Sequence, residues 1–203
     1  PEALAARLAR EPQVRVLQHG WGHKRHSPET EKKMELGDHR PVAEMLAELR
    51  SGYERLASLF PASFLPVLVP PWNRIGETVN AERRSVGLAG LSMFGPQRSG
   101  DPHQVNTHVD IIDWGARAPM SRGQVYALLC REAERRLQGD PEPVGVLSHH
   151  LVHQEESWAL LDGILGLLRG HPGVEWPAID SLFALPSEES GARRAGAHRS
   201  KHA

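Results

Sequence analysis

Twelve histidines among 203 residues give this chain an unusual supply of side chains for metal binding and proton transfer. His19 and His23 lie four residues apart, directly after the apolar run at residues 14–17. Two imidazoles at this spacing can converge on one metal ion at about 2.0–2.1 Å, and the glycines between them let the backbone approach a ligand closely. The spacing therefore predicts a metal-binding pair, with His26 at the rim of the site or behind it.

Two aspartates and a further histidine follow other apolar runs. Asp110 and Asp113 frame two isoleucines in the segment Asp-Ile-Ile-Asp-Trp. Burying a carboxylate is costly unless it is paired, so Asp113 is expected to have an arginine or histidine partner; a turn or cap aspartate is the alternative. His149 follows the run at residues 144–148 and is placed for general acid chemistry, although a structural histidine would show the same pattern.

A rigid loop is predicted after the apolar run at residues 65–69, where two prolines and a tryptophan come together. Pro71 and Trp72 suit the wall of a pocket at a strand mouth; the alternative is a structural loop with Trp72 packed in the core. Arg74 is either a surface cation or the partner of a carboxylate.

These motifs must be positioned by alternating strands and helices. The apolar spacing predicts helices at residues 2–10, 40–60, 77–86 (ending at Gly87), 121–137 (beginning at Ser121) and 153–168. Short apolar runs predict strands at residues 14–17, 65–69, 88–94, 105–112, 144–148 and 174–176. This alternation predicts an α/β fold with a mainly parallel sheet or barrel, in which ligands bind at the carboxyl ends of the strands.

The bulk composition excludes several classes of function. A net charge of -1 gives no sign of a nucleic-acid partner, and no apolar stretch is long enough to span a membrane. Cys130 is the only cysteine, so the chain has no internal disulfide and no cysteine-based zinc site; its apolar neighbours predict a core position. A cytoplasmic location is the default expectation, while the oligomeric state is not indicated.

Taken in order, the motifs resemble the polysaccharide deacetylase family, the NodB-homology domain of carbohydrate esterase family four. His19-x-x-x-His23 resembles the metal motif of that family, and Pro71-Trp72 the aromatic part of its Arg-x-Pro-aromatic motif. Asp110-Ile-Ile-Asp113-Trp114 is similar to its Asp-x-x-Asp-Trp motif, and Leu147-Ser148-His149 to its Leu-x-His motif. The resemblance covers residues 14–180 and implies an incomplete (β/α) barrel that removes acetyl groups from N-acetylated sugars.

The resemblance also implies a role for each matching residue. His19 and His23 would bind a divalent metal, with zinc the first choice, and the Trp72 N–H would help to stabilise an oxyanion. His149 would protonate the leaving amine, oriented by Asp113, and Trp114 would wall the acetyl pocket together with Pro71. The implied partner is a carbohydrate or another acetylated small molecule.

The chain departs from the family pattern in two places. The family's opening strand carries an Asp-Asp pair, which occurs nowhere in the 203 residues, and its arginine aligns with Val69, for which Arg74 is the only substitute nearby. We therefore expect residues 1–186 to form a deacetylase-like domain without its first strand, weakly active or inactive, followed by a disordered tail at residues 187–203.

Two alternatives remain open at this point. One is a catalytically silent carbohydrate- or metal-binding module with the same fold. The other is an amidohydrolase-like metallohydrolase, for which the additional metal ligands would be His108, Asp110, His149 and His150.

Overall fold

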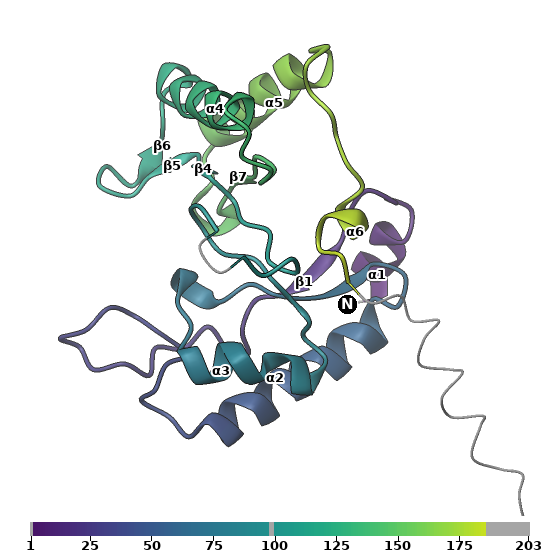
Figure 1. The fold of residues 1–203 in the computed structure, drawn as a ribbon, viewed down its shortest axis with the longest axis vertical. Coiled ribbons are helices and arrows are strands. Elements are labelled where there is room, and N and C mark those ends of the chain that lie inside the picture. The colour runs from purple at the N-terminus through teal and green to yellow at the C-terminus, as the bar shows by residue number, and fades with distance from the viewer. Residues whose placement is uncertain (1, 98–99, 186–203) are drawn as a thin grey trace, which may run out of the picture.

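The computed structural model describes residues 2–97 and 100–185 and shows a mixed α/β architecture. Helices lie at two ends of the molecule, with short strands between them (Figure 1). Residues 186–203, which include the tail expected to be disordered, lie outside the described part.

The first sheet is parallel and has the order β1-β2-β3. Its strands are β1 (Val16–Gln18), β2 (Phe64–Leu68) and β3 (Gly90–Leu91). Val16 is opposite Phe64 and Gln18 is opposite Leu68, so the register shifts by a bulge between them. Because all three strands run in one direction, the segments that follow them emerge at one edge.

Parallel pairing continues beyond β3. Isolated bridges join Leu91 to Gln104 and Phe94 to Thr107, and the same segment then leads into β4 (Val109–Asp110), which pairs in parallel with β7 (Val146–Leu147). A small antiparallel hairpin joins β5 (Ile112–Asp113) to β6 (Ala118–Pro119). Within residues 2–97 and 100–185 these pairings form small sheets and no closed barrel.

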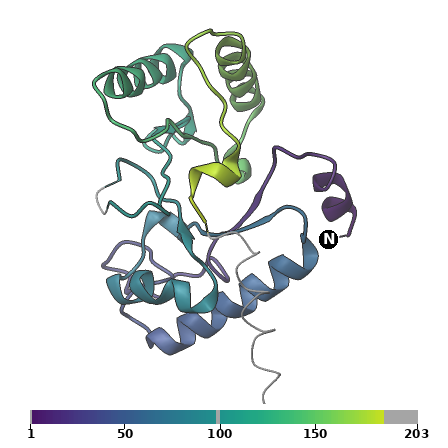
Figure 2. The same cartoon turned by 45° about the vertical axis from the view of Figure 1, so that its right-hand side comes forward.

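Two groups of helices cover the strands. Below them in Figure 1 lie α2 (Val42–Leu59), α3 (Glu77–Glu82) and the turn η2 (Arg83–Val86); above them lie α4 (Arg122–Leu137) and α5 (Glu155–Arg169). The view in Figure 2 separates the same two groups. The lower core consists of Leu36, Met45, Leu49, Leu68, Val79, Val86, Leu88 and Leu91. The upper core consists of Val109, Ile111, Ile112, Val125, Leu160 and Ile164.

A third, smaller core lies on the other face of β2. Leu65 and Val67 alternate with Leu68 along the strand, and they pack against Phe183 at the end of α6 (Ile179–Leu182). An ion pair holds this terminal segment to the sheet, with the Arg15 guanidinium 2.5 Å from Asp180 Oδ2. The first helix, α1 (Glu2–Leu8), buries none of its residues.

Most predicted helices are confirmed with small changes of boundary. Ser121 caps α4 through a reciprocal pair with Gln124, and Gly87 ends η2 with φ at +94°, as the sequence predicted. The predicted helix at residues 77–86 is divided into α3 and η2. Along α5, Leu160 and Ile164 are buried, whereas Trp158 and Leu165 are exposed.

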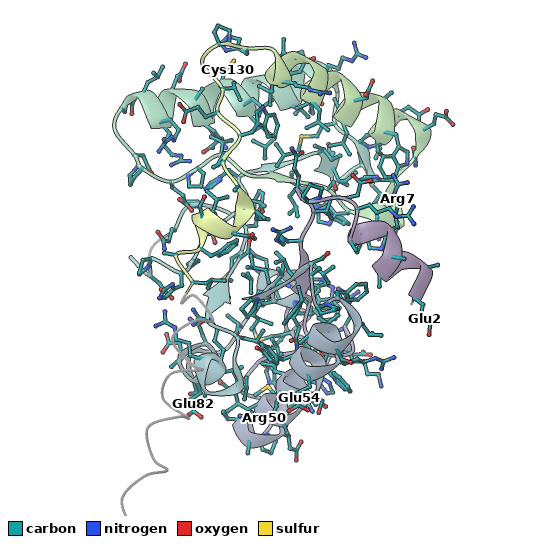
Figure 3. All side chains as sticks on the ribbon, turned by 90° about the vertical axis from the view of Figure 1, so that its right-hand side faces the viewer. Glu2, Arg7, Arg50, Glu54, Glu82 and Cys130 are labelled. Carbon is teal, nitrogen blue, oxygen red and sulfur yellow. The ribbon has the colours of Figure 1, made fainter. Side chains whose placement is uncertain are left out.

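The strand predictions were less accurate. The predicted strand at residues 88–94 shrinks to two residues, and that at residues 105–112 is divided between β4 and β5. Residues 174–176 form no strand. Cys130 lies exposed on α4 (Figure 3), so its predicted core position is wrong. No helix in the described part is long and apolar enough to cross a membrane.

Candidate functional site

The imidazole of His19 is oriented by a backbone carbonyl. His19 follows β1, and its Nδ1 lies 2.8 Å from the carbonyl oxygen of Val69, the residue that follows β2. A carbonyl oxygen only accepts hydrogen bonds, so Nδ1 carries the proton and Nε2 keeps its lone pair. Metal-binding histidines usually donate their second nitrogen to such a group. Val69, where the family resemblance calls for arginine, thus contributes through its backbone.

His23 and Trp72 lie beside His19 in strained backbone conformations. The ring centroid of His23 is 5.0 Å from that of His19 and 4.3 Å from that of Trp72. The φ angles of His23, Trp72 and Asn73 are +51°, +54° and +59°, a region that residues other than glycine occupy at a cost of about 1–3 kcal/mol. Strain of this kind concentrates at functional sites, and here it affects three neighbouring residues.

The Asn73 side chain joins the Trp72 loop to the segment that follows β3, through the two hydrogen bonds that a backbone peptide group would make. Asn73 Nδ2 donates to the Phe94 carbonyl at 3.2 Å, and Asn73 Oδ1 accepts from the Phe94 N–H at 2.6 Å. The loop itself is the tight turn η1 (Pro71–Asn73), in which Pro71 is buried and Trp72 has a non-helical conformation. These contacts fix the wall of the site.

A second group forms where β4 and β7 end. His149 Nε2 lies 3.0 Å from Asp110 Oδ2, and the indole N–H of Trp114 donates to the same oxygen at 2.9 Å. The backbone N–H of Ile112 donates to Asp110 Oδ1 at 2.9 Å. The ring of Trp114 also meets that of His149 edge to face, with centroids 4.8 Å apart. Asp110 therefore orients both aromatic side chains and has partners on both oxygens.

Asp113 does not make the contact that the resemblance implies. Its Oδ1 accepts hydrogen bonds from the backbone N–H groups of Gly115 and Ala116, at 2.8 and 3.1 Å. This is the turn aspartate of the alternative interpretation, and it closes the β5–β6 hairpin. The expectation that Asp113 orients His149 is wrong, because Asp110 lies closer along the strand end and takes that role.

The two groups are close enough to influence each other electrostatically. The pKa of His19 is lowered, chiefly because the surrounding protein disfavours the charged ring although part of the imidazole reaches solvent. The neighbouring imidazoles of His23 and His149 also lower the pKa of His19, while the Val69 carbonyl and Glu35 raise it. A lowered pKa keeps His19 neutral near pH 7, which is the form that binds metal.

Glu35 is a functional candidate that the sequence analysis missed. It is 1% exposed, and its Oε1 accepts the backbone N–H groups of Trp21 and Gly22 at 3.0 and 2.7 Å. Its Oε2 is buried and has no hydrogen-bond partner among the described residues. Glu35 follows no predicted strand, and its only sequence signal was an acidic residue between Met34 and Leu36, two apolar side chains close after the histidines.

Other candidates lie away from this site. His26 is exposed and contributes to the low pKa of Glu48. Arg74 donates to the Lys33 carbonyl at 2.9 Å and so holds a loop. His150 is exposed at the start of the turn η3 (His150–Val152).

His108, a metal ligand in the amidohydrolase alternative, is engaged elsewhere. Its side chain is 2% exposed, and Nε2 lies 3.3 Å from Glu142 Oε2. Its Nδ1 accepts the Gly145 N–H at 3.3 Å. A buried histidine with both nitrogens in contact with protein atoms is not available to a metal near His149, so the structure does not support that alternative.

Only two of the ligands needed for a metal centre come together. The free Nε2 of His19 and the adjacent ring of His23 fit a pair of zinc ligands. Among the described residues, however, no three histidine, cysteine, aspartate or glutamate side chains are arranged to hold an ion. A hollow of about 370 Å³ is lined in part by Gln18, His19, Trp21 and Arg55, and His23 does not line it.

Comparison with known proteins gave no match: no family model, no curated protein and no solved structure is significantly similar to this chain.

Proposed function

We propose that this protein is a metal-dependent hydrolase that removes acetyl groups from an N-acetylated sugar or polysaccharide. The supporting observation is that the ring of His23 lies beside those of His19 and Trp72, and that His149, held by Asp110, is near enough to His19 to affect the pKa of His19. These residues follow or end four separate strands. The order of these motifs resembles that of polysaccharide deacetylases, whose incomplete (β/α) barrel is the fold we propose for this domain.

The metal would be held by His19 and His23, with zinc as the first choice. A bound divalent cation supplies Lewis-acid chemistry, polarising a carbonyl and lowering the pKa of water. The Val69 carbonyl keeps the His19 proton on Nδ1, so that Nε2 faces the site as a lone pair. The backbone N–H of Trp72 would donate to the oxygen of the scissile amide.

His149 is the proposed proton donor to the leaving amine. Its Nε2–H is directed at Asp110, so a second proton is carried on Nδ1 and passes from there to the nitrogen of the departing amine. The Asp110 carboxylate stabilises the charged imidazole and fixes its orientation. Trp114 keeps the Asp110 oxygen in place and forms one wall of the acetyl pocket.

One observation favours the alternative of a silent binding module. The chain contains no Asp-Asp pair, and the described residues provide no third ligand beside the two histidines. A domain with these features could bind zinc and sugar without turnover. The two functions therefore have to be separated by assay.

The test is release of acetate from N-acetylglucosamine oligomers, with zinc and with EDTA. We expect zinc-dependent release, which His149→Ala lowers about 100-fold or more while zinc binding, measured by calorimetry, is unchanged. The neighbouring exposed residue provides the control variant His150→Ala, which should retain activity. Binding of zinc and oligomer without release would establish the silent module, and absence of zinc binding would contradict both.

A further inference from the structure

The buried carboxylate of Glu35 has one oxygen without a hydrogen bond in the described part of the chain and lies against the loop that carries the two histidines. Glu35 is 1% exposed, yet Oε2 makes no hydrogen bond within the described part of the chain. Leaving a buried charged atom unpaired costs about 1–3 kcal/mol or more, so proteins rarely retain one without a use. Glu35 therefore requires an explanation beyond packing.

The position of Glu35 is fixed from two sides. Its Oε1 accepts the N–H groups of Trp21 and Gly22, which lie between the two histidines in the chain. Its neighbour Leu36 pairs with Ile75 and accepts the Gly76 N–H at 2.6 Å. The Glu35 carboxylate thus holds the histidine loop, and the backbone of the next residue holds the segment that follows Trp72.

The free oxygen lies directly against the histidine loop. A Cβ atom added to Gly20 would be 2.5 Å from Glu35 Oε2 and 2.6 Å from Pro71 Cγ. Gly20 also has φ at +65°. Only glycine satisfies both the conformation and the space, so the loop approaches the carboxylate as closely as a backbone can. The negative charge of Glu35 acts on His19 from this position.

Within the described part of the chain, no cation forms an ion pair or a hydrogen bond with this oxygen. Arg40 is near enough for Glu35 to influence its pKa, but its guanidinium nitrogens bond instead to the two oxygens of Glu48, at 2.7 and 2.8 Å. His19 is influenced by the charge of Glu35, and its ring centroid lies 5.0 Å from that of His23.

We propose that Glu35 supplies the negative charge of the cation site formed by His19 and His23. One oxygen of its carboxylate positions the loop that carries the two histidines, and the other oxygen is free. The inference rests on the proposed function, since it assumes that the two histidines bind a cation. A bound cation would compensate the charge that the chain leaves unpaired, which explains why a neutral glutamine does not occupy the position. Glu35 is a positioning residue and touches no substrate.

The test compares zinc affinity in the unsubstituted protein, in Glu35→Gln and in the control Glu142→Gln. Glutamine keeps an oxygen for the Trp21 and Gly22 N–H groups, removes the charge and replaces the free oxygen with an amide NH2 group. The Glu142 side chain is also largely shielded, with 9% of it exposed, and accepts a backbone N–H. Glu142 precedes β7, however, and so lies at the opposite end of that strand from His149. Calorimetry should show affinity lowered at least about tenfold in Glu35→Gln and unchanged in Glu142→Gln.

Thermal unfolding in EDTA provides a second reading. Without metal, Glu35→Gln should melt no lower than the unsubstituted protein, because it removes an unpaired buried charge. With zinc, Glu35→Gln should melt at a lower temperature than the unsubstituted protein. A purely structural role predicts instead that the variant melts lower in EDTA and binds zinc with unchanged affinity, and that result would overturn the inference while leaving the proposed function intact.

Should Glu35→Gln fail to fold, the unsubstituted protein still decides the question. Zinc should shift the ¹³C resonance of the Glu35 carboxyl carbon and leave that of Glu142 in place. Zinc binding without this shift overturns the inference alone. Absence of zinc binding by the unsubstituted protein overturns the inference and the proposed function together.

Discussion

Asp110 and Glu35 are both carboxylates beside the candidate site, but the protein surrounds them differently. Asp110, in the carboxy-terminal half, has three donors: the Ile112 N–H, the Trp114 indole and His149. Glu35, in the amino-terminal half, is more deeply buried and has donors on one oxygen only. The carboxy-terminal group is therefore completed by the chain itself, whereas the amino-terminal group requires a further partner. A metal ion at the two histidines would meet that requirement.

The largest effect is expected when the amino-terminal group loses a ligand. Even the hydrogen-bond partners of metal ligands contribute about 10–100-fold to metal affinity, so His19→Ala should lower zinc affinity by at least about 100-fold. His26→Ala is the matched control, because His26 belongs to the same loop but lies near Glu48. Calorimetric titration measures both variants. Equal losses in both would show that zinc binds elsewhere and would remove the contrast between the two halves.

The next effect tests which aspartate serves the carboxy-terminal group. Asp110→Asn removes the charge that stabilises protonated His149, so deacetylation should fall at least about tenfold, with a changed pH–rate profile. Asp113→Asn should remain within about twofold, since asparagine also closes turns of this kind. Kinetics on both variants distinguish the observed geometry from the arrangement implied by the family resemblance. A larger loss of activity in Asp113→Asn than in Asp110→Asn would favour the arrangement implied by the resemblance, in which Asp113 orients His149.

The smallest effect concerns the ion pair between Arg40 and Glu48 in the amino-terminal half. The hydrogen bonds from Arg40 hold the pKa of Glu48 below its usual range. Because the folded-state pKa is depressed, this stabilisation is present above the ordinary value of about 4.3 and is lost as the pH falls through the folded value. Glu48→Gln should therefore lower the free energy of unfolding by about 1 kcal/mol at pH 7.

Urea unfolding at pH 7 and at pH 3 measures this difference, which should shrink at the lower pH. Glu54→Gln, on the exposed side of the same helix (Figure 3), should change stability by less than about 0.5 kcal/mol at both pH values. A pH-independent effect of Glu48→Gln would show that packing rather than charge holds this segment.

The sequence predicted the helices better than the strands. Long periodic segments such as α2 and α4 were recognised because many residues contribute to one pattern, and Ser121 and Gly87 marked ends by their own chemistry. The strand at residues 105–112 was expected to be continuous. Asp110 interrupts the strand because its side chain accepts the Ile112 N–H. The spacing of apolar residues does not predict a hydrogen bond of this kind.

For the site, the sequence located the participants but not all of their contacts. It selected His19, His23 and Trp72, which the structure places side by side, and His149, which lies in the second group and influences the pKa of His19. It assigned the partner of His149 to Asp113 because motif order says nothing about which of two carboxylates reaches the ring. Glu35 was missed because its role arises from burial and from contacts with backbone N–H groups far along the chain. Zinc binding and hydrolysis remain predictions.

The pairing of the Asn73 side chain with Phe94 has a consequence for evolution of the protein. The amide supplies one donor and one acceptor at the spacing of a peptide unit, so aspartate would lose the donor and leucine would lose both. Conversely, breaking these two bonds would detach the tryptophan turn while every ladder bond between β2 and β3 stays in place. Substitutions at this one position could thus reshape the entrance without weakening the sheet beneath it.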